Sequence, residues 1–186
     1  VRSRGLGDVY KRQELIRRGI KSDIHLTSTK VPDYFISGFD LSMRQGKAEN
    51  IMYSGRIEKA KGVYETVDTF SILKSQYKDL TLTFVGDGSE LPKLKQYVEN
   101  KKIKDVRFTG RLCGEDFKKE YINADMYLFL SYTEGMPTVV LEAMIFGLPI
   151  FTRKVGGLID FFENGKMGYI SSSLDPAVFA EAMKPY

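Results

Sequence analysis

The stretch that decides the fold is MYLFLSYTEGMPTVVLEAMIFGLPIFT, residues 126–152. It begins with five apolar residues in a row, passes through a polar loop into an apolar helical segment, and ends on a second short apolar run. A strand that is covered on both faces need not alternate apolar and polar residues, so MYLFL is typical of a parallel strand inside a layered sheet. Strand, helix and strand in this order form the unit of a parallel α/β fold.

The same alternation runs along the chain from residue 49. In the segment 62–77, for example, Val63, Val67, Phe70 and Leu73 recur at helical spacing, with Ile72 beside them. The predicted strands are 50–54, 80–85, 106–109, 126–131, 149–152 and 168–171, and the predicted helices lie near 62–77, 89–101, 114–123, 137–147, 157–163 and 175–184. This pattern predicts an α/β fold, a parallel sheet with helices on both faces.

Two segments before residue 49 depart from this alternation. Residues 1–13, VRSRGLGDVYKRQ, show no apolar period and resemble translated sequencing-adapter read-through, with a native solvated arm as the alternative. Residues 14–48 contain a short helical segment and an extended one, interrupted by Pro32 and Gly38. We therefore expect a non-native segment at 1–13, a linker and remnant of a preceding domain at 14–48, and an α/β domain at 49–186.

Composition narrows the class of protein. The 186 residues are 42% hydrophobic and 28% charged, an ordinary balance for a chain that fills a core. Residues 1–13, with four basic residues against one acid, carry +3 of the net charge of +4, so we expect no nucleic-acid partner. The single cysteine, Cys113, excludes a disulfide within the chain and fits a reducing compartment. The single histidine, His25, excludes a His-rich metal site and is given no role.

The predicted strands end in loops of one character. Ligands of an open parallel sheet bind beyond the carboxyl ends of its strands. Glycine lets a backbone approach a ligand closely, although any single glycine is more often part of a tight turn. Five strand ends combine glycine with charged residues: Ser54-Gly55-Arg56, Gly86-Asp87-Gly88, Gly110-Arg111, Tyr132-Thr133-Glu134-Gly135 and Arg153-Lys154-Val155-Gly156-Gly157. Together they predict a ligand site at this rim of the sheet.

The predicted helix 137–147 contains one acid in an otherwise apolar sequence, so we expect it to be largely buried. That acid, Glu142, lies five residues after Pro137, roughly 7–8 Å along the helix axis, which places it beside the rim. An isolated buried carboxylate needs a partner. Two kinds of partner fit equally well: the hydroxyls of a bound ligand, or a structural ion pair with Arg56 or Arg153.

The start of the same helix suits an anion. Pro137 fits the first turn, and the unpaired N–H groups there carry about half a positive charge. Arg56 and Lys61 follow the first strand and could converge on this point, although an isolated lysine is more often a solvated surface charge. Two cations and a helix dipole match a diphosphate of roughly two negative charges without a metal.

Several competing motifs are missing from the sequence. It contains no GxxxxGK[ST] phosphate loop, no GxSxG nucleophile elbow and no Asp-x-Asp pair that would hold a metal–diphosphate. The turn after the first strand is SGRIEKAKG rather than GxGxxG, which weakens the case for a dinucleotide-dependent oxidoreductase.

Taken together, these motifs resemble the C-terminal, donor-binding domain of retaining glycosyltransferases with the GT-B fold, in the large family-four group. SGRIEKAKG is similar to the G-R-x4-K-G element of that group, FVGDGSELPKL to its VGDG turn, RFTGR to the element that meets the nucleotide base, and EGMPTVVLEAMIFGLPI to its pair of glutamates separated by seven residues. VGGLIDFFENGKMGYI is similar to the next segment, with Ile159-Asp160 in place of the usual Pro-Glu. The resemblance covers about residues 20–186 and implies a Rossmann-like domain.

The resemblance also implies roles for individual residues. Arg56 and Lys61 would bind the donor diphosphate and stabilise charge on the departing nucleotide, and Glu134 would hold a hydroxyl of the transferred sugar; these three are the catalytic candidates. Glu142 would accept hydrogen bonds from the ribose hydroxyls. The other candidates for donor binding are Gly55, Arg111 and Leu112, of which the last two border the base, and Gly135, Met136, Pro137, Thr138 and Val139. The substrate would be a UDP- or GDP-linked sugar, with no cofactor and no metal site.

The implied activity is transfer of a sugar to a saccharide or lipid-linked acceptor with retention of configuration, as in polysaccharide biosynthesis. GT-B enzymes hold the acceptor on an N-terminal domain, of which only a remnant around KVPDYFISGFD is present, so we expect this chain to be inactive alone. A stand-alone nucleotide-binding module that acts with a partner chain is the alternative, and an epimerase or phosphorylase of the same fold fits less well. We expect a cytoplasmic location, with peripheral contact to the inner face of the membrane left open.

Overall fold

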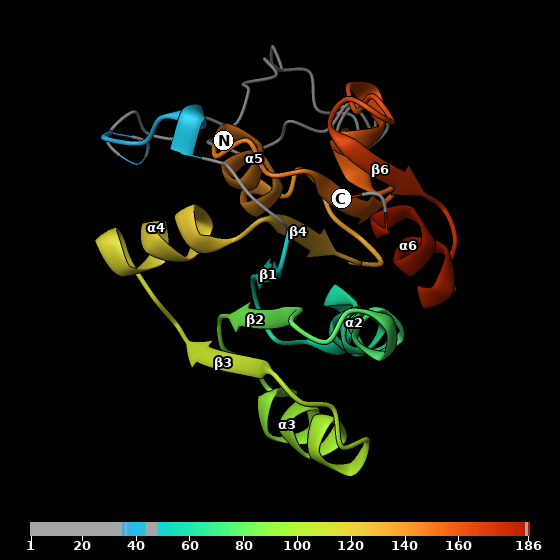
Figure 1. The fold of residues 1–186 in the computed structure, drawn as a ribbon. Coiled ribbons are helices and arrows are strands. Elements are labelled where there is room, and N and C mark those ends of the chain that lie inside the picture. The colour runs from blue at the N-terminus through green and yellow to red at the C-terminus, as the bar shows by residue number, and fades with distance from the viewer. Residues whose placement is uncertain (1–34, 36, 44–47, 185) are drawn as a thin grey trace, which may run out of the picture.

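The computed structural model describes residues 35, 37–43, 48–184 and 186. The predictions for residues 1–13, for His25 and for most of 14–48 lie outside this part. Within it, six strands form one parallel sheet in the order β3-β2-β1-β4-β5-β6 (Figure 1). The strands are β1 (Asn50–Ser54), β2 (Thr81–Val85), β3 (Val106–Gly110), β4 (Met126–Phe129), β5 (Ile150–Arg153) and β6 (Gly168–Ser171). This order is that of a Rossmann-like domain, so the prediction of the fold class is confirmed.

The connections between the strands are mostly helical, as predicted. The α-helices are α2 (Val63–Gln76), α3 (Leu91–Asn100), α4 (Gly114–Asn123), α5 (Thr138–Ile145) and α6 (Pro176–Met183), and the 3-10 helices are η2 (Leu41–Met43), η3 (Lys59–Lys61) and η4 (Gly156–Asp160). All but one of the predicted strands and helices are present, with ends that differ by at most two residues.

One predicted helix is wrong. The segment 157–163 contains no α-helix, and the short 3-10 helix η4 (Gly156–Asp160) stands in its place. Gly156 adopts a positive φ of 53°, and the Gly157 amide donates a hydrogen bond to the Gly135 carbonyl oxygen at 2.7 Å. The start of the segment is therefore bound to the loop after β4 instead of opening a regular helix.

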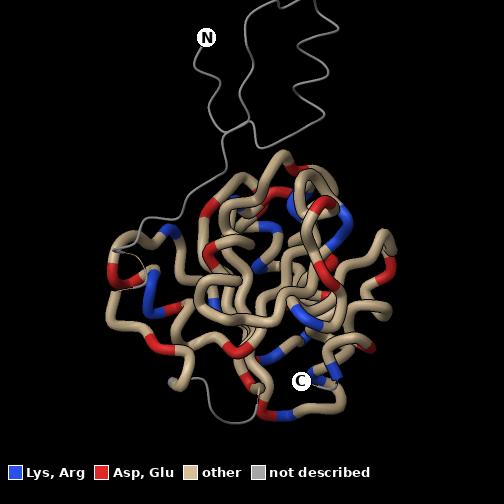
Figure 2. The backbone as a smooth tube through the Cα atoms, turned by 90° about the horizontal axis from the view of Figure 1, so that it is seen from above, with Lys and Arg blue, Asp and Glu red and all other residues tan. Residues whose placement is uncertain are grey.

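Helices cover both faces of the sheet (Figure 1). On one face α2 packs against α6 and α3; on the other, α4 contacts β1, and α5 contacts β4 and β5. Every residue of β4 and β5 is buried, as the unbroken apolar run MYLFL predicts. Basic and acidic residues are interspersed along the chain (Figure 2). No helix in the described ranges is long and apolar enough to cross a membrane.

The described part of the segment before residue 49 contacts the α4 and α5 side of the domain. The Phe35 ring lies 5.8 Å from the Tyr121 ring and 5.3 Å from the Phe146 ring, and the Phe39 ring lies 5.0 Å from the Phe146 ring. The buried Lys118 side chain donates a hydrogen bond to the carbonyl oxygen of Ser37 at 2.5 Å. Aromatic packing and a buried charge therefore anchor these residues to the domain.

Candidate functional site

Two adjoining hollows open at the carboxyl ends of β1, β2, β3 and β4. The larger hollow, of about 590 Å³, is lined by Gly55, Arg56, Val85, Gly86, Asp87, Gly88, Arg111, Leu112, Phe117 and Val139. The smaller hollow, of about 230 Å³, is lined by Gly55, Arg56, Lys61, Phe129, Glu134, Met136, Pro137, Thr138 and Val139. Because Gly55, Arg56 and Val139 line both, the two hollows meet at the end of β1 and the start of α5.

The structure brings ten of the twelve predicted site residues to these hollows. Eight of them, with the three catalytic candidates among them, line the smaller hollow, and Gly55, Arg56 and Val139 of these also line the larger one. The other two, Arg111 and Leu112, line only the larger hollow. Gly135 and Glu142 line neither. The Gly135 carbonyl oxygen instead accepts the hydrogen bond from Gly157, and Glu142 lies one helical turn beyond Val139.

Two aromatic residues of the hollows were missed by the sequence analysis. Phe117 lies on α4 and Phe129 on β4, and each has the residue type and spacing of an ordinary core position. Phe129 is the last residue of β4 and Phe117 lies in the first turn of α4, and the exact end of a strand or helix is the least visible feature of a sequence.

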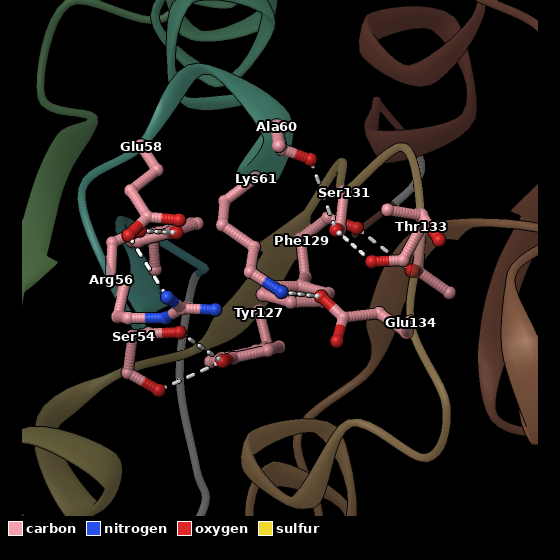
Figure 3. Close-up of polar contacts among 12 residues, drawn as sticks. Ser54, Arg56, Glu58, Ala60, Lys61, Tyr127, Phe129, Ser131, Thr133 and Glu134 are labelled. Atoms are coloured by element: carbon pink, nitrogen blue, oxygen red, sulfur yellow. Dashed lines mark hydrogen bonds and ion pairs between the residues drawn. The ribbon is translucent and has the colours of Figure 1, made fainter. Parts of the chain in front are cut away.

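Lys61 and Glu134 form an ion pair in the smaller hollow (Figure 3). The Lys61 Nζ atom lies 2.7 Å from Glu134 Oε1, and the two side chains are only 16% and 12% exposed. The loop that carries Glu134 is held to η3 by the Tyr132 amide and the Ser131 hydroxyl, which both donate hydrogen bonds to the Ala60 carbonyl oxygen, at 3.0 and 3.3 Å. Two segments about 70 residues apart in the sequence thereby place a cation and a carboxylate together.

Gly62 permits this close approach. It has a φ of +68°, and a Cβ atom added to it would lie 1.9 Å from the carbonyl oxygen of Leu130. Both the left-handed backbone and the missing side chain are therefore required for η3 to reach the end of β4. The fold therefore requires a glycine at the last position of the SGRIEKAKG motif.

Neither arginine that could neutralise Glu142 does so. Arg56 extends a side chain that is 69% exposed and pairs with Glu58 at 3.0 Å (Figure 3). Arg153 is buried, donates hydrogen bonds to the carbonyl oxygens of Leu130, Ser173 and Leu174, and lies over the Tyr132 ring at 4.3 Å. The alternative of a structural ion pair is therefore wrong.

Glu142 has a tyrosine as its partner. The Tyr121 hydroxyl donates a hydrogen bond to Glu142 Oε2 at 2.9 Å and is itself hydrogen-bonded to the Ser54 hydroxyl at 2.8 Å. Burial raises the pKa of the Glu142 carboxyl, and the hydrogen bond from Tyr121 acts in the opposite direction. Among the described residues, the half-buried carboxylate thus pairs with no positive charge.

The expectation that the helix around Glu142 is largely buried is wrong in part. In α5 only Val140 and Ala143 are buried, and Ile145 is 38% exposed. The reason is that α5 packs on β4 and β5 with one face, while its other face is not covered by the described residues.

The start of α5 leaves backbone amides for a ligand. No side chain caps this end, and the first amides to donate within the turn are those of Val140 and Leu141, to the Pro137 carbonyl oxygen. The amides of Thr138 and Val139 precede them, and both residues line the smaller hollow. An anion in that hollow would meet two amides, the positive end of the helix and Lys61.

Two further features of the described residues concern the binding of a metal ion and the presence of a thiol near the hollows. In the parts of the chain described above, no three His, Cys, Asp or Glu side chains are grouped so that they could hold a metal ion. Cys113 is exposed, and it directly follows Leu112, which lines the larger hollow.

We expect Glu142→Gln to stabilise the fold at pH 8 and to leave it unchanged near pH 4. A carboxyl whose pKa is raised by folding adds stability below its unfolded pKa and loses it as the pH rises through its folded pKa. The uncharged amide avoids that loss, so thermal unfolding should show a Tm about 2 °C higher at pH 8 only. Glu99→Gln, at an exposed acid of α3, is the control with the same charge change. An equal shift of Tm at both pH values would contradict the prediction.

Comparison with known proteins agrees with the fold and with the motifs at the rim. Residues 42–185 match the family model of glycosyl transferases group 1. A glycogen synthase of Mycobacterium tuberculosis is 31% identical over 142 residues, which are 76% of this chain and 34% of that protein. The chain therefore spans about a third of the length of this curated relative.

Two solved structures share the fold. The C-terminal domain of a glycosyl transferase group 1 family protein (LpcC) from Francisella tularensis has a TM-score of 0.67 at 23% identity, over 74% of each chain. Anabaena Alr3699/HepE in complex with UDP and glucose has a TM-score of 0.66 at 20% identity, over 80% of this chain and 45% of that one. Such neighbours are GT-B glycosyltransferases, and the chain belongs to the family of group 1 glycosyl transferases.

Proposed function

We propose that this chain is the donor-binding half of a retaining glycosyltransferase that moves a sugar from a nucleotide-sugar to a saccharide or lipid-linked acceptor. The pair of adjoining hollows supports this function. One hollow combines Lys61, Glu134 and the start of α5, and the other lies between the ends of β2 and β3. A nucleotide-sugar likewise consists of two parts, a nucleoside and a sugar, joined by a diphosphate.

In this proposal the diphosphate lies where the hollows meet. Arg56 lines both hollows and has an exposed, extended side chain, so it can follow the phosphates, while Lys61 and the amides of Thr138 and Val139 meet them from the smaller hollow. The base lies in the larger hollow, beside Arg111 and Leu112. The volume of that hollow, about 590 Å³, is within the range of small-molecule sites.

The chemistry follows from this placement. Cleavage of the bond between the sugar and the diphosphate leaves an additional negative charge on the nucleoside diphosphate, which Arg56, Lys61 and the dipole of α5 stabilise. Glu134 accepts a hydrogen bond from a sugar hydroxyl and fixes the sugar beside the breaking bond. The acceptor hydroxyl oxygen forms the new bond to the sugar with the anomeric configuration retained, and its proton passes to the departing nucleoside diphosphate. The positive charges of this chain are arranged to do this without a metal, and they suit a UDP- or GDP-linked donor, in keeping with the UDP in the HepE complex.

The acceptor and the location belong to the same proposal. The resemblance implies that the acceptor lies on an N-terminal domain, so we propose that this chain binds a donor but transfers no sugar by itself. A cytoplasmic location is proposed on the single cysteine, which suits a reducing compartment.

Calorimetric titration of the chain with UDP, GDP and ADP tests the proposal. We expect one of the three to bind in the high micromolar to millimolar range, because half of the enclosing site is supplied elsewhere. The same titration with Glu142→Gln should show about tenfold weaker binding of that nucleotide, since a hydrogen bond from a ribose hydroxyl to a charged carboxylate is replaced by a weaker one to a neutral amide oxygen. A folded protein that releases no heat with any of the three would overturn the proposed function.

A further inference from the structure

We infer that Tyr121 is a positioning residue that holds the Glu142 carboxylate in place for the ribose hydroxyls of the nucleotide. The inference rests on the proposed function and adds to it a residue that lines neither hollow. Tyr121 lies on α4 and Glu142 on α5, so the contact joins two helices on the same face of the sheet.

The Tyr121 hydroxyl is part of a directed chain of hydrogen bonds. Its single proton is donated to Glu142 Oε2 at 2.9 Å rather than to the more distant Val139 carbonyl oxygen at 3.4 Å. The Ser54 hydroxyl, 2.8 Å away, therefore donates to the Tyr121 oxygen. The Tyr127 hydroxyl then donates to Ser54, either to its Oγ atom at 2.8 Å or to its carbonyl oxygen at 3.1 Å. The protons of Ser54 and Tyr121 thus point along one path toward the carboxylate, and bonds in such a chain strengthen one another.

The Tyr121 ring cannot easily leave this position. It is fully buried and stacks on the Phe146 ring with a centroid distance of 5.3 Å and an angle of 7° between the planes. The Phe117 and Phe35 rings contact it edge-on, at 5.1 and 5.8 Å. A side chain locked by packing on several sides gives a fixed direction to the hydrogen bond that it donates.

The bond leaves the other carboxylate oxygen available. Among the described residues, Glu142 Oε1 has no hydrogen-bond partner, while Oε2 is held by Tyr121. Thr138 and Val139 precede Glu142 by four and three residues, so the three share one side of α5, and the first two line the smaller hollow. The free oxygen therefore belongs to the side of the helix that faces the proposed nucleotide.

The ribose dependence of binding separates this role from a merely structural one. We take the nucleoside diphosphate that binds most tightly among UDP, GDP and ADP, together with its 2′,3′-dideoxy analogue, and titrate both into the parent chain and Tyr121→Phe. We expect the variant to bind the ribose form about fivefold or more weakly than the parent does, and to bind the dideoxy form as tightly as the parent does. The loss should grow as the pH falls, because the pKa of Glu142 rises further without the Tyr121 proton donor.

Tyr127→Phe is the matched control. It also removes one buried tyrosine hydroxyl that is bonded to Ser54, but this hydroxyl is three hydrogen bonds away from the carboxylate. Tyr127→Phe should leave the ratio of the affinities for the ribose form and the dideoxy form within twofold of the ratio in the parent. The double variant Tyr121→Phe/Glu142→Gln should bind the ribose form no more weakly than Glu142→Gln alone, since Tyr121 acts through Glu142.

The outcomes distinguish this inference from the proposed function. If Tyr121→Phe loses the same affinity for the ribose form and the dideoxy form, the inference is wrong and the proposed function stands. The same holds if Tyr121→Phe binds both forms as the parent does, while Glu142→Gln loses affinity for the ribose form. If the parent binds none of the three nucleotides, the proposed function and the inference both fail. Should Tyr121→Phe not fold, Ser54→Ala removes the bond that orients the Tyr121 hydroxyl, and the same selective loss of ribose affinity is expected.

Discussion

Lys61→Met is expected to weaken binding of the nucleoside diphosphate by about 50- to 100-fold. The variant removes one of the two cations that line the smaller hollow and leaves Glu134, now unpaired, close to the position proposed for the phosphates. A hydrogen bond between charged groups contributes about 1.5–3 kcal/mol, and the uncompensated carboxylate adds repulsion. Calorimetry with the nucleotide that the parent chain binds best measures the effect.

The same substitution also destabilises the fold, and a second variant separates the two effects. Removing one partner of a buried ion pair costs about 3–5 kcal/mol, but both side chains here retain some exposure, so we expect about 1–2 kcal/mol. Lys61→Met/Glu134→Gln removes both charges. This double variant should regain most of the lost stability but not the affinity for the nucleotide. Recovery of binding in this double variant would show that Lys61 acts only by neutralising Glu134.

Gly62→Ala is expected to lower the free energy of unfolding by at least 3 kcal/mol. The added Cβ atom would lie 1.9 Å from a backbone oxygen, which cannot move aside as a flexible side chain can. The left-handed φ of +68° adds about 1 kcal/mol for a residue with a side chain. Denaturant unfolding monitored by circular dichroism measures the change.

Gly110→Ala is the matched control for this variant. Gly110 has a similar φ of +75°, but a Cβ atom built there would meet nothing within 4 Å. It should cost only about 1 kcal/mol, the conformational part alone. If both variants lost the same free energy, the close contact with Leu130 would have no energetic weight. In Gly62→Ala protein that still folds, displacement of η3 should lengthen the Lys61–Glu134 contact and weaken nucleotide binding.

Much of the fold could be predicted because its signals are local. An apolar run such as MYLFL, followed by a polar loop and a helical period, specifies a strand and a helix without knowledge of the remaining chain. The predicted helix 157–163 does not form because the conformation of this segment depends on a hydrogen bond to Gly135, more than twenty residues away. No periodicity within the segment carries that information.

The site was predictable to the extent that topology determines it. Parallel strands bring their ends to one rim, so the loops with Arg56, Arg111 and Glu134 could be grouped before any contact was known. The pairing between them could not be predicted, because it depends on side-chain distances. The sequence therefore left open an arginine as the partner of Glu142, whereas the structure shows Tyr121, from a helix to which no functional motif points.

The position of Cys113 has a practical consequence. The thiol is exposed at the start of α4, next to the proposed base site, and the chain contains no second cysteine. A maleimide fluorophore would therefore attach at one known point of the unaltered sequence, and its emission would report the arrival of a nucleotide in a plate-based titration. The equilibrium constants required above can then be screened in microlitre volumes before any calorimetry is done.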